Sequence, residues 1–151
     1  MKTLKYLIES LLIKLFFLIF KIIGYKKASN LGASIGSIVG PLFRSKNLVK
    51  KNIQYAFPNL TDDEMQKFIK KMWTNYGRIF SEYMYIQKFR RKELEKYLNI
   101  NGIKTLEKIK KDGKPVVFIS GHFNNFELMA MQLELYGIQL AAVYRPLNNF
   151  F

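Results

Sequence analysis

The chain has 151 residues, enough for one domain with a hydrophobic core, and its 49% apolar composition excludes a disordered chain. It has no cysteine, which excludes disulfides, thiolate nucleophiles and cysteine-based zinc sites, and with a single histidine we expect no metal site. Lysine and arginine number 25 against 11 acidic residues, a formal net charge of +14. A field of this sign favours nucleic acid, anionic lipid or an acidic carrier protein as partner, and charge alone does not choose among them.

The sequence pattern of residues 1–27 predicts a membrane anchor. Residues 4–25 are mostly apolar, over a length that suits one bilayer crossing of about 20 residues, but Glu9, Lys14 and Lys21 interrupt the run. The alternatives are therefore a marginal transmembrane helix and an amphipathic helix that lies in the membrane interface. More positive residues follow this segment than precede it, which predicts that the body of the protein lies in the cytoplasm.

The next segment carries three glycines at a spacing of four, Gly32, Gly36 and Gly40, and Pro41 then marks the end of the helix. Such a ridge of small residues lets two helices approach closely. We expect it to pack as a hairpin against the first helix; the alternative is an oligomerisation face.

Two local patterns follow the glycine ridge. The basic stretch from Arg44 to Lys51 is either a contact for lipid headgroups or an ordinary solvated helix face. Thr61 and Glu64 form a capping box, which is a strong helix start. Apolar residues at helical spacing from Met65 to Met84 predict that this helix turns a stripe toward the core.

The second half of the chain alternates strand and helix patterns, which indicates an α/β fold. The fully apolar strand should be central and parallel, with right-handed crossovers to its neighbours. The predicted architecture is an N-terminal membrane helix and helical hairpin, then a partial, mainly parallel sheet flanked by helices. The predicted elements are a strand at 97–101, a helix at 103–112, the apolar strand at 115–120, a helix at 125–136 and a strand at 139–144.

The only histidine, His122, directly follows the predicted central strand, and Glu127 comes five residues later. A carboxylate that fixes the imidazole tautomer leaves the other ring nitrogen as a general base, and N–H groups at the helix start would stabilise an oxyanion. Alternatively, Glu127 only completes a capping box with Asn124, and His122 only binds a loop carbonyl. Ser120 is a weak nucleophile candidate, because a serine in this position usually points elsewhere.

The stretch Gly121–Glu127 resembles the His-x4-acid motif of the glycerolipid acyltransferase superfamily. Within it, the chain is similar to the lauroyl/myristoyl acyltransferases of lipid A biosynthesis in Gram-negative bacteria. Family members usually have Gly at position 124 and Trp at position 126, where this chain has Asn124 and Phe126. Further matching features occur in order along the chain: the N-terminal apolar segment, Asn52 to Pro58, Asn75-Tyr-Gly-Arg78 with Glu82, Gly102, and Val143-Tyr-Arg-Pro146.

The resemblance implies that a fatty acyl chain moves from the thioester of acyl carrier protein to a hydroxyl of a Kdo-bearing lipid A precursor. This would occur on the cytoplasmic side of the bacterial inner membrane, without another cofactor. It implies His122 as the general base and Glu127 as the residue that orients it. Asn124, Asn125 and Arg145 are the expected substrate contacts, and an ordinary surface arginine is the alternative for Arg145.

The resemblance also implies that residues 28–151 are the N-terminal half of an α/β acyltransferase domain. The chain stops about halfway through the family's usual extent, so the alternative is a catalytically inactive, membrane-associated remnant. A basic nucleic-acid binder is the third hypothesis. We expect no nucleic-acid partner, because the aromatic residues follow apolar helical stripes and no nucleic-acid-binding motif is present.

Overall fold

The computed structural model describes residues 2–143, and all regular secondary structure in this range is helical. The described residues form two compact units, residues 15–84 and residues 2–14 with 85–143. The helices are α1 (Lys2–Ile23), α2 (Tyr25–Val39), α3 (Lys46–Ala56), α4 (Asp62–Glu82), α5 (Ile86–Arg90), α6 (Ile103–Asp112) and α7 (Phe126–Leu135). Short 3-10 turns lie at Gly40–Leu42, Tyr83–Tyr85 and Glu95–Tyr97.

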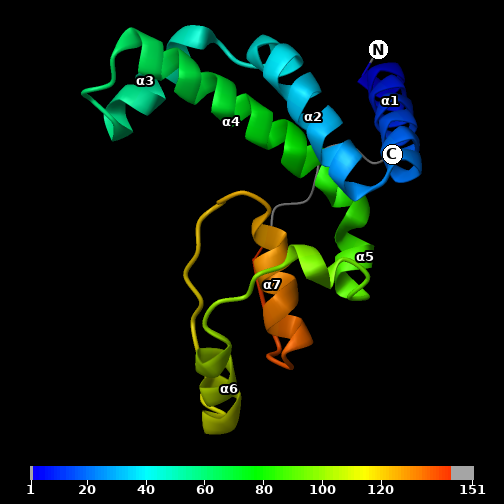
Figure 1. Ribbon diagram of the computed structural model, residues 1–151, viewed down its shortest axis with the longest axis vertical. Coiled ribbons are helices and arrows are strands. Elements are labelled where there is room, and N and C mark those ends of the chain that lie inside the picture. Colours follow the sequence, from blue (N-terminus) through cyan, green and yellow to red (C-terminus); the bar gives the residue numbers. More distant parts are fainter. Residues whose placement is uncertain (1, 144–151) are drawn as a thin grey trace. The chain divides into compact units, whose positions relative to one another are not determined.

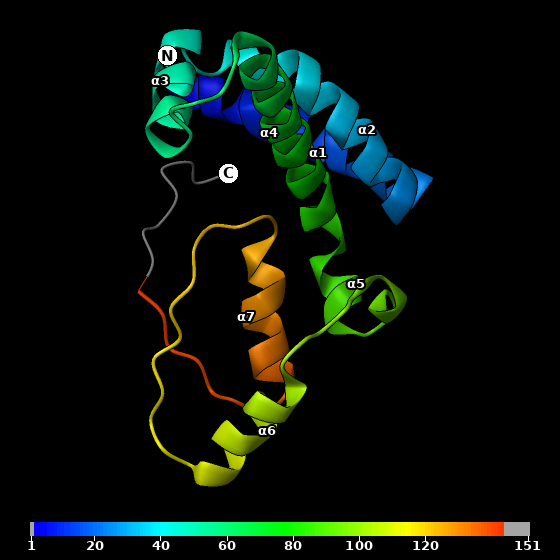
Figure 2. The ribbon, with the colours of Figure 1, turned by 60° about the vertical axis from the view of Figure 1, so that its left-hand side comes forward.

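The unit of residues 15–84 is built on α2 and α4, which lie side by side and antiparallel (Figures 1 and 2). Four glycines form the contact, Gly32, Gly36 and Gly40 of the α2 side and Gly77 of α4, and we call it the glycine seam. A Cβ added to Gly77 would lie 2.8 Å from the carbonyl carbon and closer still to the carbonyl oxygen of Gly32. The predicted close packing of the glycine ridge is confirmed. The predicted partner is wrong, because the ridge packs on α4 and not on the first helix.

A polar cluster joins the same two helices beside the glycine seam. The guanidinium of Arg78 donates hydrogen bonds to the Ser29 hydroxyl (3.2 Å) and to the Asn30 side-chain oxygen (2.9 Å). The Ser29 hydroxyl in turn donates to the Glu82 carboxylate at 2.9 Å. Ser29 of α2 thus lies between a cation and an anion of α4, so these bonds favour one register of the helix pair.

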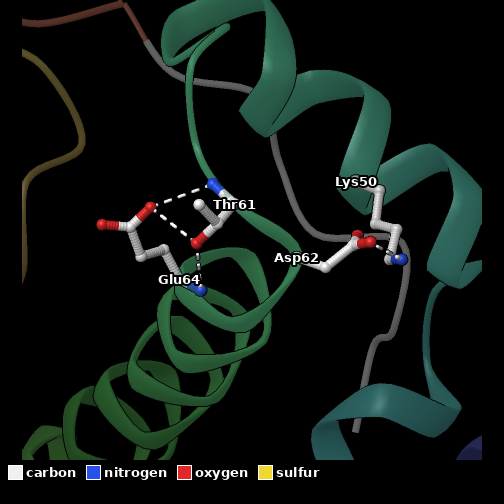
Figure 3. Close-up of polar contacts among 4 residues, drawn as sticks. All are labelled: Lys50, Thr61, Asp62 and Glu64. Carbon is white, nitrogen blue, oxygen red and sulfur yellow. Dashed lines mark hydrogen bonds and ion pairs between the residues drawn. The ribbon is translucent and has the colours of Figure 1, made fainter.

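The capping box at the start of α4 is confirmed (Figure 3). The Glu64 N–H donates to the Thr61 hydroxyl oxygen at 3.3 Å, and the Glu64 carboxylate accepts from the Thr61 N–H at 2.9 Å and from its hydroxyl at 2.8 Å. Bonds from the Thr61 backbone N–H and then its hydroxyl lower the pKa of Glu64 below its ordinary 4.5. Because the pKa of Glu64 is lower in the folded than in the unfolded protein, the capping bonds of its carboxylate stabilise the fold above pH 4.5. This stabilisation is lost as the pH falls through the folded pKa.

Thr61→Ala should reduce the free energy of unfolding by about 1 kcal/mol, because it removes the acceptor of the Glu64 N–H. Ser45→Ala is the matched control. Ser45 is the N-cap residue of α3 but makes no side-chain capping bond, so its loss should change stability by a few tenths of a kcal/mol at most. Urea denaturation followed by helical circular dichroism measures both. Equal effects of the two substitutions would contradict the capping assignment.

The predicted transmembrane helix is wrong. Among residues 2–143 no helix combines the length and the apolar character that a bilayer crossing requires. The physical reason lies in α1, which has 22 residues but carries Lys5, Glu9, Lys14 and Lys21 at intervals along its length. Its apolar side chains are nevertheless largely exposed, for example Leu18 at 56% and Ile22 at 76%. The alternative, an amphipathic helix at the membrane interface, stays a prediction.

The predicted parallel sheet is also wrong, because residues 2–143 contain no strand. Residues 115–120 have no regular secondary structure, with Val117 exposed to 85% and Ile119 to 94%. Tyr97, at the start of the first predicted strand, lies in a 3-10 turn, and residues 139–143 of the last one are irregular. The run at 115–120, with Val116, Val117 and Ile119, has the propensity for a strand, but a strand forms only when its N–H and C=O groups find a paired neighbour.

Candidate functional site

Four of the five predicted site residues, His122, Asn124, Asn125 and Glu127, lie where an irregular segment, residues 113–125, joins α6 to α7 (Figure 2). The α7 helix begins at Phe126 with Asn125 as its N-cap, one residue later than predicted, so Glu127 is the second helical residue. Asn124 adopts a left-handed backbone with φ 48°. Asparagine tolerates this conformation better than most side chains, which makes Asn124 compatible with a position where related sequences usually carry glycine.

His122 occupies the apex of a three-residue turn, which the Phe123 N–H closes by donating to the Gly121 carbonyl oxygen at 2.8 Å. The His122 side chain is exposed. Its ring meets Phe126 edge-on, with centroids 4.5 Å apart and planes at 75°. The imidazole is therefore open to a substrate and positioned by an aromatic contact with the first residue of α7.

The Glu127 carboxylate lies in the first turn of α7, where the helix dipole favours a negative charge. The structure thus places His122 and Glu127 at the same end of one helix. An imidazole and a carboxylate have the chemistry of a general base and its orienting partner when a hydrogen bond joins them. The hydrogen bond between them stays a prediction.

Ser120 does not have the surroundings of an activated nucleophile. Its hydroxyl donates to the neighbouring Gly121 carbonyl oxygen at 3.3 Å and lies 3.9 Å from the sulfur of Met129 on α7. Neither acceptor is a base that would remove the hydroxyl proton. The structure therefore agrees with the weak candidacy of this residue.

Glu127 also borders an open hollow between α5 and α7 within the same unit. One ion pair spans the hollow: the Arg90 guanidinium donates to the Glu134 carboxylate at 2.6 Å. Both side chains are about half exposed, so the pair contributes at most about 1 kcal/mol to stability. We did not predict Arg90 and Glu134, because no local pattern connects residues 44 positions apart. The hollow is lined by Ile86, Arg90, Phe126, Glu127, Ala130, Met131, Glu134, Gln139 and Leu140.

Asn125 is the expected substrate contact with the most unusual surroundings. Both polar atoms of its side-chain amide are shielded from solvent and have no hydrogen-bond partner among the described residues. A buried amide without a partner is unfavourable, and a ligand that bonds it would relieve that cost. Arg145 lies outside the described residues. In residues 2–143 no group of histidine, aspartate and glutamate side chains could hold a metal ion.

A family model described as bacterial lipid A biosynthesis acyltransferase matches residues 1–151. The chain is 26% identical over 120 residues to a lipid A biosynthesis palmitoleoyltransferase of Escherichia coli K12, which is 79% of this chain and 39% of that protein. It is 22% identical over 135 residues to a lipid A biosynthesis acyltransferase of Haemophilus influenzae, which is 89% of this chain and 42% of that protein. The chain thus spans about two fifths of the length of these relatives. No solved structure matches.

Proposed function

The chain belongs to the bacterial lipid A biosynthesis acyltransferase family, and from this premise we propose that it transfers a fatty acyl chain from acyl carrier protein to a hydroxyl of a lipid A precursor. The observation that carries the proposal is the pair His122 and Glu127 at the start of α7 in a chain of this family. Family membership supplies the reaction class. The proposal adds the donor, the acceptor and the two residues.

In the proposed reaction His122 takes the proton of the acceptor hydroxyl while the oxygen of that hydroxyl attacks the carbonyl carbon of the thioester. The C–O bond forms, the oxyanion collapses with cleavage of the C–S bond, and His122 returns the proton to the departing sulfur. Glu127 holds the imidazole in one tautomer and stabilises its charged form. No acyl-enzyme is required, which agrees with the absence of cysteine and the surroundings of Ser120.

The substrates are proposed to bind through polar groups around the start of α7. The unpartnered Asn125 amide supports a substrate contact, and Asn124 and Arg145 are proposed as further substrate contacts. The net charge of +14 supports both an acidic carrier protein and a phosphorylated lipid. We also propose that the protein works at the cytoplasmic face of the inner membrane. The exposed apolar side chains of α1 support its contact with that surface as an interfacial helix.

The test is an acyl-transfer assay with the purified 151-residue chain, radiolabelled acyl carrier protein thioester and a Kdo-bearing lipid A precursor. The expected result is a labelled lipid whose mass has increased by one acyl group. A parallel reaction with acyl coenzyme A identifies the donor, and one with a deoxy acceptor that lacks the free hydroxyl is the blank. Absence of transfer from either donor would reject the proposal for this chain and favour the inactive-remnant alternative.

A further inference from the structure

The last turn of α2 and the 3-10 turn after it present three large apolar side chains to solvent. Ile38, Leu42 and Phe43 are exposed to 74%, 82% and 76%, and we call them the apolar tip. They belong to the unit of residues 15–84, in which the turn joins the end of the glycine seam. Leu42 and Phe43 are adjacent in the chain and Ile38 precedes Leu42 by four residues, and groups of exposed apolar side chains are typical of interaction surfaces.

The backbone that carries the apolar tip is held in place from behind. Gly40 packs so closely on the indole of Trp73 in α4 that a Cβ there would lie 2.5 Å from the ring atom Cδ2 and closer still to Cε3. The Phe43 N–H donates to the Gly40 carbonyl oxygen at 3.0 Å, which closes the 3-10 turn. The turn is therefore a fixed support, and its apolar side chains need no rearrangement to meet a partner.

The charge around the apolar tip is positive. Residues 25–61 contain six lysines and arginines and no aspartate or glutamate. Arg44 and Lys46 directly follow the tip and are exposed. Lys50, farther along α3, pairs with Asp62 at 3.8 Å and so contributes less (Figure 3). The nearest charges thus form a basic rim beside an apolar projection.

We propose that the apolar tip inserts into the interface of an anionic lipid bilayer while Arg44 and Lys46 contact the headgroups. A bilayer accepts protruding side chains without a matching pocket, and its negative surface attracts cations next to it. An acidic protein would satisfy the same charges but would need a cavity for three projecting apolar side chains. The lipid surface therefore fits these observations better. This contact is separate from α1 and does not depend on the proposed acyl transfer.

The absence of cysteine allows a direct test of insertion in the full chain. Single cysteines at Leu42, Phe43 and, as control, the exposed Lys71 of α4 are labelled with a polarity-sensitive dye. Protein bound to phosphatidylglycerol–phosphatidylethanolamine vesicles should show blue-shifted emission and quenching by brominated acyl chains at positions 42 and 43 but not at 71. Probes at 42 and 43 that behave like the one at 71, or a chain that does not bind these vesicles, would overturn the proposal. A blue shift that acyl carrier protein alone produces would assign the surface to a protein partner.

A second measurement compares vesicle affinities of variants. Leu42→Ser with Phe43→Ser should weaken binding to the anionic vesicles roughly tenfold, because it removes two apolar side chains from the inserted tip. The matched control is Val117→Ser with Ile119→Ser, which removes as much exposed apolar surface from the other unit and should change binding by less than twofold. Equal losses would mean that general hydrophobicity drives binding. Neither readout uses an acyl donor, so the inference is tested even in a chain that fails to transfer.

Discussion

Gly77→Ala should destabilise the fold by about 2 kcal/mol or more, although the same substitution at an open helix position is stabilising. Alanine inside a helix is favoured over glycine by about 1 kcal/mol, because glycine loses more backbone freedom on folding. Here the added Cβ would meet backbone atoms, the carbonyl group of Gly32 and the Cα of Gly36, the latter at 2.9 Å. Backbone cannot rotate away as a side chain can, so α2 and α4 must separate. The cost of overpacking, about 1–3 kcal/mol and at times more, therefore exceeds the gain in propensity.

Urea denaturation of the full chain, followed by helical circular dichroism, measures the effect. Thr74→Ala is the matched control on the same helix. Among the described residues the Thr74 side chain bonds only the Lys70 carbonyl one turn earlier, so alanine should be neutral or slightly stabilising. A Gly77→Ala protein as stable as the control would mean that α2 and α4 do not pack this closely at the glycine seam.

Gly32→Ala provides an internal check of the same contact. Its Cβ would meet the Gly77 carbonyl and the Ser81 side chain, whose Cβ lies 2.8 Å away. If both substitutions act by separating the same two helices, the first one already makes room for the second. The double variant Gly32→Ala, Gly77→Ala should then lose clearly less than the sum of the single losses. Strict additivity would show that the two glycines act independently.

The sequence predicts those parts of the fold that depend on neighbours in the chain. Thr61 and Glu64 are three residues apart and form their capping box as expected. Pro41 follows the last residues of α2, and Gly113 ends α6 in a left-handed conformation, φ 61°. Each of these signals acts within one helical turn, so no tertiary information is needed to interpret it.

Contacts between distant segments could not be predicted in the same way. Gly32 and Gly36 of α2, with Gly40 directly after it, predict a close helix partner, but only Gly77, 45 positions after Gly32, identifies this partner as α4. A search for a second small residue inside another predicted helix would have found it. The strand prediction also depended on a distant segment. The run around Val117 has β propensity, but residues 2–143 contain no second strand with which it could pair.

In the candidate site, too, the local features could be predicted from the sequence and the long-range contacts could not. The position of His122 and Glu127 at the start of a helix is local, and the helix was predicted to within one residue at each end. The Arg90–Glu134 ion pair, which lines the same hollow as Glu127, joins α5 to α7 and has no local signature. The single residue by which the start of α7 was misplaced changes the position of Glu127 from third to second in the helix. The alternative, in which the Glu127 carboxylate completes a capping box with Asn124, stays a prediction.

In the acyl-transfer assay, His122→Ala should lower the rate by about 10²–10⁴-fold, the usual contribution of a general base. The His122 side chain is exposed, so its loss should leave the helical signal and the unfolding midpoint nearly unchanged. Ser120→Ala is the control from the same segment. Its hydroxyl bonds only the neighbouring carbonyl and the Met129 sulfur, so the variant should keep its activity. A His122→Ala protein with normal turnover would remove His122 from the reaction.

Glu127→Gln tests whether the carboxylate acts through its charge. Glutamine has the same length and retains an acceptor oxygen, but it cannot stabilise an imidazolium or fix the tautomer as a carboxylate does. If Glu127 orients His122, the rate should fall by about 10²-fold or more while stability changes little. The double variant His122→Ala, Glu127→Gln should then be no slower than His122→Ala alone, because a positioning residue has no effect once the base is gone. If Glu127 only stabilises the start of α7, Glu127→Gln should lower the unfolding midpoint and leave turnover intact. That outcome would contradict the assignment of Glu127 as the partner of His122.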